Sequence, residues 1–145
     1  MKIPYGSQYI NEDDIQSVVS VLKGDWLTQG PTIDAFEKAF AQYADAQYAI
    51  AFNSGTSALH GAMFAAGVAE GDEIITSPIT FAASANCGVY MGAKPVLADI
   101  DPKTYCIDPE EIKKNITQKT KVIIPVDLAG YPVNIDKIKE SINAD

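Results

Sequence analysis

The sequence predicts an α/β fold in three layers, with a mostly parallel sheet between two layers of helices. Apolar segments typical of strands begin near residues 48, 73, 95 and 122, which are 25, 22 and 27 residues apart. Helical patterns lie between most of them, and this alternation is typical of βαβ units and parallel sheets. Two of the segments, 49–52 and 123–126, are apolar on both faces. Strands that are covered by helices on both sides have this composition.

Two helices are predicted before the first strand. Asn11 is a good N-cap for a helix over 12–23, because three acidic residues follow it in the first turn. Pro31 fits the start of a second helix, over 32–44, because proline fits the first helical position. The loop over 25–31 joins the two helices and contains the chain's only tryptophan.

The rest of the chain alternates between strands and helices. Glycines at 67 and 92 end two of the helices, and Asp108 with Pro109 begins a short third one. The predicted elements, in chain order, are a strand over 48–52, a helix over 56–66, a strand over 73–77, a helix over 81–91, a strand over 95–100, the short helix from 109, a strand over 122–126, a loop over 127–132 and a helix over 135–142.

The most informative stretch is Asn53–His60, where a predicted strand leads into a helix. The first turn of a helix has four backbone N–H groups without an intrahelical partner, and the helix dipole adds partial positive charge there. Gly55 lets a ligand approach the backbone closely, and Ser54, Thr56 and Ser57 supply hydroxyl groups. These features describe a phosphate site. They also describe an ordinary N-cap, and this stretch alone leaves both interpretations open.

Further candidate residues lie where the predicted strands end. In open α/β sheets, ligands bind beyond the carboxyl ends of the strands. The strand over 73–77 leads to Phe81, the next carries Asp99 and Asp101 near its end, and the last leads to Asp127. A phosphate site, an aromatic ring and a carboxylate at one edge would suit a flat, phosphorylated cofactor. The alternatives are that Phe81 is a core residue and that the first two aspartates only form turns.

Composition excludes several classes of function. With 11 basic and 19 acidic residues the net charge is −8, so we expect no binding to nucleic acid or anionic membranes. A single histidine and two cysteines without metal-ligand spacing predict no metal site. The sequence has no P-loop, dinucleotide fingerprint or nucleophile elbow. Because no apolar run resembles a signal peptide or a membrane span, we expect a cytoplasmic protein.

Five motifs resemble, in order and spacing, the DegT/StrS family of sugar aminotransferases, which depend on pyridoxal 5'-phosphate (PLP). They are Ser54–His60, Gly71–Pro78, Thr80–Ala83, Gly92–Val96 and Thr120–Val126. The resemblance covers essentially the whole chain and implies the N-terminal part of the large domain of transferase fold type I. Residues 1–46 would be the N-terminal helices and substrate loop, and residues 47–145 the βαβ units.

The resemblance also implies roles for particular residues. Thr56 and Ser57 would bind the PLP phosphate, Gly55 would permit its close approach, and Phe81 would stack on the pyridine ring. Asp127 matches a position where the family has a polar group at the rim of the site.

A substrate site is implied as well. Thr28 and Gln29 would belong to a substrate loop near a dimer interface, with Tyr5 on the same wall. The segments 27–31 and 126–130 are most similar to the branch that makes pseudaminic acid precursors. That branch aminates a UDP-linked 4-keto-6-deoxy-N-acetylhexosamine with glutamate as amino donor, and the full-length protein would be a homodimer.

One departure from the family concerns the reacting group. None of the eleven lysines falls on the family's Schiff-base lysine motif, and the aspartate that pairs with the pyridine nitrogen has no match before Asp145. We therefore expect a fragment without catalytic residues, inactive alone and prone to self-association. Two alternatives stay open: a dehydratase of the same family with histidine in place of the lysine, and a non-catalytic α/β binding module.

Overall fold

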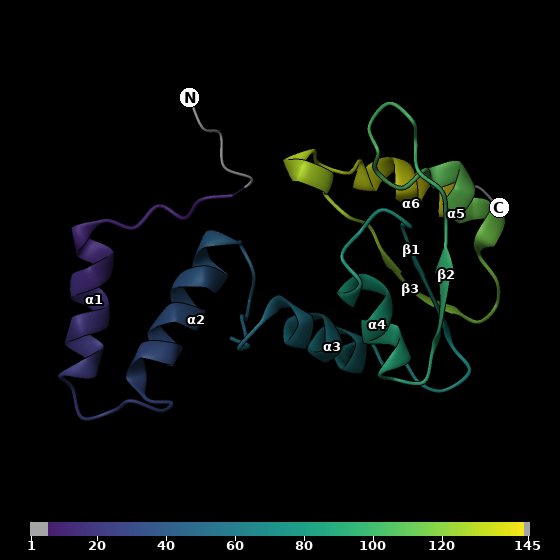
Figure 1. Ribbon diagram of the computed structural model, residues 1–145. Helices are drawn as coiled ribbons and strands as arrows, with labels where there is room; N and C mark the ends of the chain where they lie inside the picture. Colours follow the sequence, from purple (N-terminus) through teal and green to yellow (C-terminus); the bar gives the residue numbers. More distant parts are fainter. Residues whose placement is uncertain (1–5, 144–145) are drawn as a thin grey trace. The chain divides into compact units, whose positions relative to one another are not determined.

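The computed structural model describes residues 6–143 and divides the chain into two compact units, Met1–Ala51 and Phe52–Asp145. Among the described residues, the first unit contains two helices, and the second contains a parallel sheet with four helices and a short 3-10 helix (Figure 1). In the described part of the chain, no helix has both the length and the apolar character needed to cross a bilayer.

Both helices predicted for the first unit are confirmed, as α1 (Glu12–Leu22) and α2 (Pro31–Tyr43). The Asp14 N–H donates to the Asn11 side chain at 3.0 Å, and the Asn11 N–H donates to the Asp14 carboxylate at 2.9 Å. This reciprocal pair, a capping box, satisfies two donors at the start of α1. Pro31 takes the first position of α2, as its fixed φ favours.

The strand predicted over 48–52 is wrong. Residues 48–52 have no regular secondary structure, and no strand among the described residues pairs with them. Tyr48 and Ile50 are 76% and 74% exposed, so the apolar character of the run is not matched by burial. The Ala51 N–H instead donates to the Glu37 carboxylate at 2.8 Å. A strand requires a ladder partner, and apolar sequence alone does not supply one.

The second unit is built on three parallel strands in the order β2-β1-β3. They are β1 (Glu73–Thr76), β2 (Lys94–Leu97) and β3 (Thr120–Ile124), each at a predicted strand but with shifted ends. β3 stops directly before Pro125, because proline has no N–H for the ladder. Pro95 is tolerated inside β2 because that strand lies at the edge of the sheet.

Helices cover both faces of this sheet, which confirms the three-layer α/β fold (Figure 1). One layer comprises α3 (Gly55–Ala65) and α4 (Ala83–Val89), and the other comprises α5 (Pro109–Asn115) and α6 (Ile135–Asn143). The neighbours Ile74 and Ile75 on β1 point to opposite faces and are both fully buried. Ile74 packs with Met63 of α3 and Cys87 of α4. Ile75 packs in the second core, with residues of α5 and α6.

Candidate phosphate and cofactor site

The start of α3 is an open helix N-terminus. Ser54 is the N-cap in extended conformation, and its Oγ accepts a hydrogen bond from the Ser57 N–H at 3.1 Å. The Ser54 hydroxyl also donates to the Ser57 Oγ at 3.0 Å. Among the described residues, no hydrogen bond occupies the N–H groups of Gly55 and Thr56. The N-cap interpretation is therefore correct, and it still leaves two backbone donors available.

Gly55 keeps these donors accessible. A Cβ atom at this position would meet no other atom within 4 Å, so open space lies in front of the backbone. Gly55 is exposed, and Thr56 and Ser57 are half-buried. Two free N–H groups, two hydroxyls and the positive end of an 11-residue helix are together suited to bind a phosphate group.

Phe81 lies in the connection between β1 and α4, and its side chain is 76% exposed. The alternative that it is a core residue is therefore wrong. The connection is held by a hydrogen bond between the Thr80 and Ser84 hydroxyls at 2.7 Å, and by one from the Ile79 N–H to the Ser77 Oγ at 3.2 Å. The helix that follows this connection, α4, packs against α3.

Asp127 lies between β3 and the short helix η1 (Leu128–Gly130), and its carboxylate closes a loop. The Asp127 Oδ1 accepts a hydrogen bond from the Val133 N–H at 2.8 Å. Inside this loop, Ala129 and Gly130 have φ values of 53° and 83°. Ala129 is thus in the left-handed region, which is strained for a residue with a side chain. The loop geometry fixes Asp127 beyond the carboxyl end of β3.

Asp99 and Asp101 are turn formers. The Asp99 carboxylate accepts the Ile100 N–H at 2.8 Å. The Asp101 carboxylate accepts the N–H groups of Lys103 and Thr104 at 2.6 and 3.2 Å, which lowers the pKa of Asp101. The structure thus favours the turn alternative for both residues.

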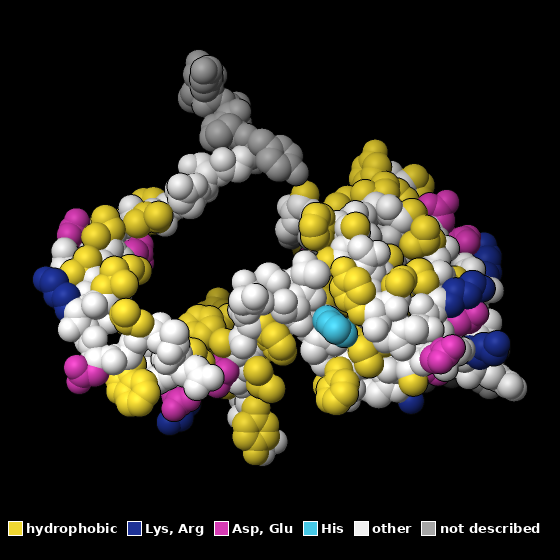
Figure 2. All heavy atoms as spheres, turned by 60° about the horizontal axis from the view of Figure 1, so that its bottom comes forward, with side chains coloured by type: hydrophobic (Ala, Val, Ile, Leu, Met, Phe, Trp, Pro, Cys, Tyr) yellow, Lys and Arg dark blue, Asp and Glu magenta, His cyan; other side chains and the backbone are white. Residues whose placement is uncertain are grey.

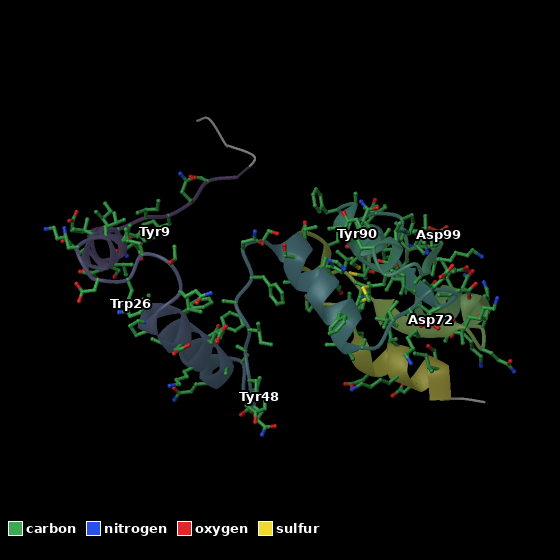
Figure 3. The ribbon with its side chains drawn as sticks, turned by 90° about the horizontal axis from the view of Figure 1, so that it is seen from below. Tyr9, Trp26, Tyr48, Asp72, Tyr90 and Asp99 are labelled. Carbon is green, nitrogen blue, oxygen red and sulfur yellow. The ribbon has the colours of Figure 1, made fainter. Side chains whose placement is uncertain are left out.

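Thr28 and Gln29 form the tip of the loop between α1 and α2 in the first unit. Gln29 and Gly30 have φ values of 56° and 89°, so the tip is tightly turned. Trp26 packs on this turn, since a Cβ atom on Gly30 would lie 2.8 Å from the Trp26 Cβ (Figure 3 labels Trp26). Tyr5 lies outside the described residues.

His60 is an exposed packing residue of α3. Its ring centroid lies 5.3 Å from that of Tyr90, which follows α4, and the two ring planes are tilted by 58°. Figure 2 shows the histidine at the surface, beside hydrophobic side chains. No group of three or more metal-ligating side chains occurs among the described residues.

A pocket of about 700 Å³ opens elsewhere in the second unit, beside α5 and α6. Gly55, Thr56, Ser57, Phe81 and Asp127 do not line it, whereas the candidate residue Asp101 does. Its charged lining comprises the carboxylates of Asp101, Asp108, Glu110 and Glu140 against the single ammonium of Lys137. This charge repels a phosphate, so the pocket is not the site that the motifs predict. No sequence motif marks this pocket, because its lining residues come from separate segments that only folding brings together.

Comparison with known proteins identifies the family. Residues 8–144 match the DegT/DnrJ/EryC1/StrS aminotransferase family. Over 136 residues the chain is 43% identical to the spore coat polysaccharide biosynthesis protein SpsC of Bacillus subtilis, covering 94% of this chain and 35% of SpsC.

Solved structures agree with this assignment. Spr1654 from Streptococcus pneumoniae, assigned as a sugar aminotransferase, superposes in its PLP-form with a TM-score of 0.92 and 35% identity, over 97% of this chain and 36% of Spr1654. PseC from Helicobacter pylori, an aminotransferase involved in the biosynthesis of pseudoaminic acid, superposes with a TM-score of 0.87 and 34% identity, over 97% of this chain and 38% of PseC. The chain spans about a third of the length of these relatives. It belongs to the DegT/DnrJ/EryC1/StrS aminotransferase family.

Proposed function

We propose that this chain supplies the phosphate- and ring-binding part of a PLP-dependent sugar aminotransferase. The observation that carries the proposal is the open start of α3, where the Gly55 and Thr56 N–H groups have no partner among the described residues. The PLP-form of Spr1654, which superposes on nearly the whole chain, supports the choice of PLP as the phosphorylated ligand.

The residues present fit the phosphate and ring of PLP. The Gly55 and Thr56 N–H groups and the Thr56 hydroxyl would donate to the phosphate. Since the Ser57 Oγ accepts from Ser54, its own hydroxyl hydrogen is free to donate as well. The exposed ring of Phe81 would stack on the pyridine. When bound, PLP supplies an electron sink for amino-group transfer.

The substrate proposal is narrower and rests on likeness to PseC. We place a nucleotide-linked 4-keto-6-deoxy sugar as acceptor and glutamate as donor. Asp127 would be the polar group at the rim of the site, and Thr28, Gln29 and Tyr5 would contact the sugar nucleotide. The turned tip at Gln29 and Gly30 supports this role, because strained backbone often occurs at binding loops.

The proposal assigns no reacting residue to this chain. None of the eleven lysines falls on the family's lysine motif, so we expect no transamination by the 145 residues alone. Exposed apolar residues on α2, such as Phe36 and Phe40, support the proposal of a homodimer for the longer protein. The free thiols of Cys87 and Cys106 support a reducing, cytoplasmic location.

A charge placed at the start of α3 tests the phosphate site. In Thr56→Asp, a carboxylate occupies the second helical position, where it suits the helix dipole and leaves stability unchanged or slightly raised. It repels a phosphate, since like charges about 4 Å apart near a surface interact by roughly 4 kcal/mol. We expect the affinity for PLP and for inorganic phosphate, measured by calorimetry, to fall by more than about tenfold.

Thr32→Asp is the matched control, because Thr32 holds the same position in α2. It should leave the affinity for PLP unchanged. Equal affinity in the wild-type chain and Thr56→Asp would refute the phosphate site at α3.

A further inference from the structure

Phe52 packs into a notch at Gly61, nine residues further along the chain. A Cβ atom on Gly61 would lie 2.5 Å from the Phe52 Cζ and 2.9 Å from its Cε1, so no larger residue fits without moving the ring. Glycine inside a helix is less favourable than alanine by about 1 kcal/mol. Gly61 is in α3, and its φ is not positive, so backbone conformation does not explain the glycine. The close approach of the Phe52 ring explains why a glycine stands at this position.

The contact does not belong to the hydrophobic core. Phe52 is 47% exposed and lies in neither of the two buried clusters of the second unit. Removing a ring at this place therefore opens no cavity in the core. A role other than core packing accounts for a half-exposed ring that is held against a helix backbone.

The position of Phe52 in the chain indicates that role. It stands two residues before the N-cap Ser54, and the ring contacts the second turn of α3. In a hydrophobic staple, a side chain just before the N-cap packs on the helix and fixes the angle at which the chain enters it. Phe52 lies one residue before the staple position, and its ring packs on the backbone at Gly61 rather than on a side chain. Here the entry is fixed on one side by the ring and on the other by the Ser54 cap. The unpartnered N–H groups of Gly55 and Thr56 lie in the first turn, between the Ser54 cap and the turn that the ring contacts.

We infer that Phe52 is a positioning residue of the phosphate site, which acts through its contact with Gly61 by setting the direction of the Gly55 and Thr56 N–H groups. This inference rests on the proposed function, because it concerns how the same site is held in shape. Donors that converge on one anion lose affinity when their directions change, even where each stays exposed.

The test compares Gly61→Ala, Phe52→Ala and the double variant. In Gly61→Ala the new methyl displaces the ring, so the affinity for PLP should fall about five- to tenfold although alanine favours the helix. Phe52→Ala should lose a similar factor. The double variant should bind no more weakly than Phe52→Ala alone, because with the ring gone the methyl has nothing to displace. The Gly55 and Thr56 amide resonances of the ligand-free chain should move in each single variant.

Ala62→Gly is the control, since it changes the helix propensity of α3 at the neighbouring, exposed position. It should leave the affinity unchanged once the fold is verified by circular dichroism. A wild-type chain that binds neither PLP nor inorganic phosphate would overturn the proposed function itself. A wild-type chain that binds PLP, together with Gly61→Ala binding equally well or with additive losses in the double variant, would overturn the role of Phe52 alone.

Discussion

The two units of the chain have equally well-defined helices but differ in the apolar surface that they bury. In the first unit, α1 has no buried residue and α2 has one, Ala41, while Val18 and Phe40 are 60% and 52% exposed. In the second unit, Ile74 and Ile75 of β1 are fully buried between two helical layers. Caps and prolines thus fix helix ends locally, whereas burial requires another element on which a helix can pack, which in the second unit is the sheet.

Replacing one isoleucine by alanine in each unit should show the largest difference in the free energy of unfolding between the units. Ile74→Ala should lower the free energy of unfolding of the second unit by about 2–5 kcal/mol, because it leaves a cavity under α4. Ile15→Ala in α1 should cost less than about 1 kcal/mol, because Ile15 is already 47% exposed. Urea unfolding with amide hydrogen exchange for each unit measures both, and equal losses would contradict the comparison.

Removal of a helix cap should lower the stability of the two units by similar amounts. Ser54→Ala removes the acceptor of the Ser57 N–H in the second unit, and Asn11→Ala removes the acceptor of the Asp14 N–H in the first. Each should cost about 1 kcal/mol, because a cap acts within one helical turn. Thermal unfolding followed by circular dichroism measures the cost. A much larger loss in only one unit would show that its helix depends on packing rather than on the cap.

The smallest expected effect is a pH dependence of the stability of the second unit. The Thr117 hydroxyl donates to Glu73 at 2.7 Å, and Lys94 lies 3.5 Å from the same carboxylate, which together lower the pKa of Glu73. A lowered folded-state pKa adds stability above the unfolded-state pKa of about 4.5, and that stability is lost as pH falls through the folded-state pKa. Wild type should therefore exceed Glu73→Gln slightly in stability at pH 7, and the gap should close at acid pH. An unchanged gap across this pH range would rule out the contribution of Glu73.

Local chemistry explains which parts of the fold were predictable. Asn11, Pro31 and Ser54 begin helices where the sequence predicts them, because capping needs only neighbouring residues. β3 stops before Pro125 for an equally local reason, although the apolar pattern predicts a strand that continues to residue 126. The run over 48–52 misleads, because its composition is that of a strand while strand formation depends on a partner that the run itself does not contain.

The candidate site likewise has features that the sequence could predict and features that it could not. The open helix start at Gly55, Thr56 and Ser57 could be predicted, because small hydroxyl residues followed by a helical pattern are readable in sequence, and their binding of a phosphate stays a prediction. The packing of Phe52 on Gly61 was not predicted, because it depends on where the chain bends before α3. The 700 Å³ pocket was not predicted either, because its lining comes from segments that only folding brings together.

Titration of the ¹⁵N-labelled chain with PLP, followed by amide resonances, shows whether the start of α3 binds a phosphate. We expect saturable shifts of the Gly55 and Thr56 N–H signals, with inorganic phosphate moving the same signals. Shifts confined to residues that line the 700 Å³ pocket, such as Asp101 and Lys137, with Gly55 and Thr56 unmoved, would contradict this expectation.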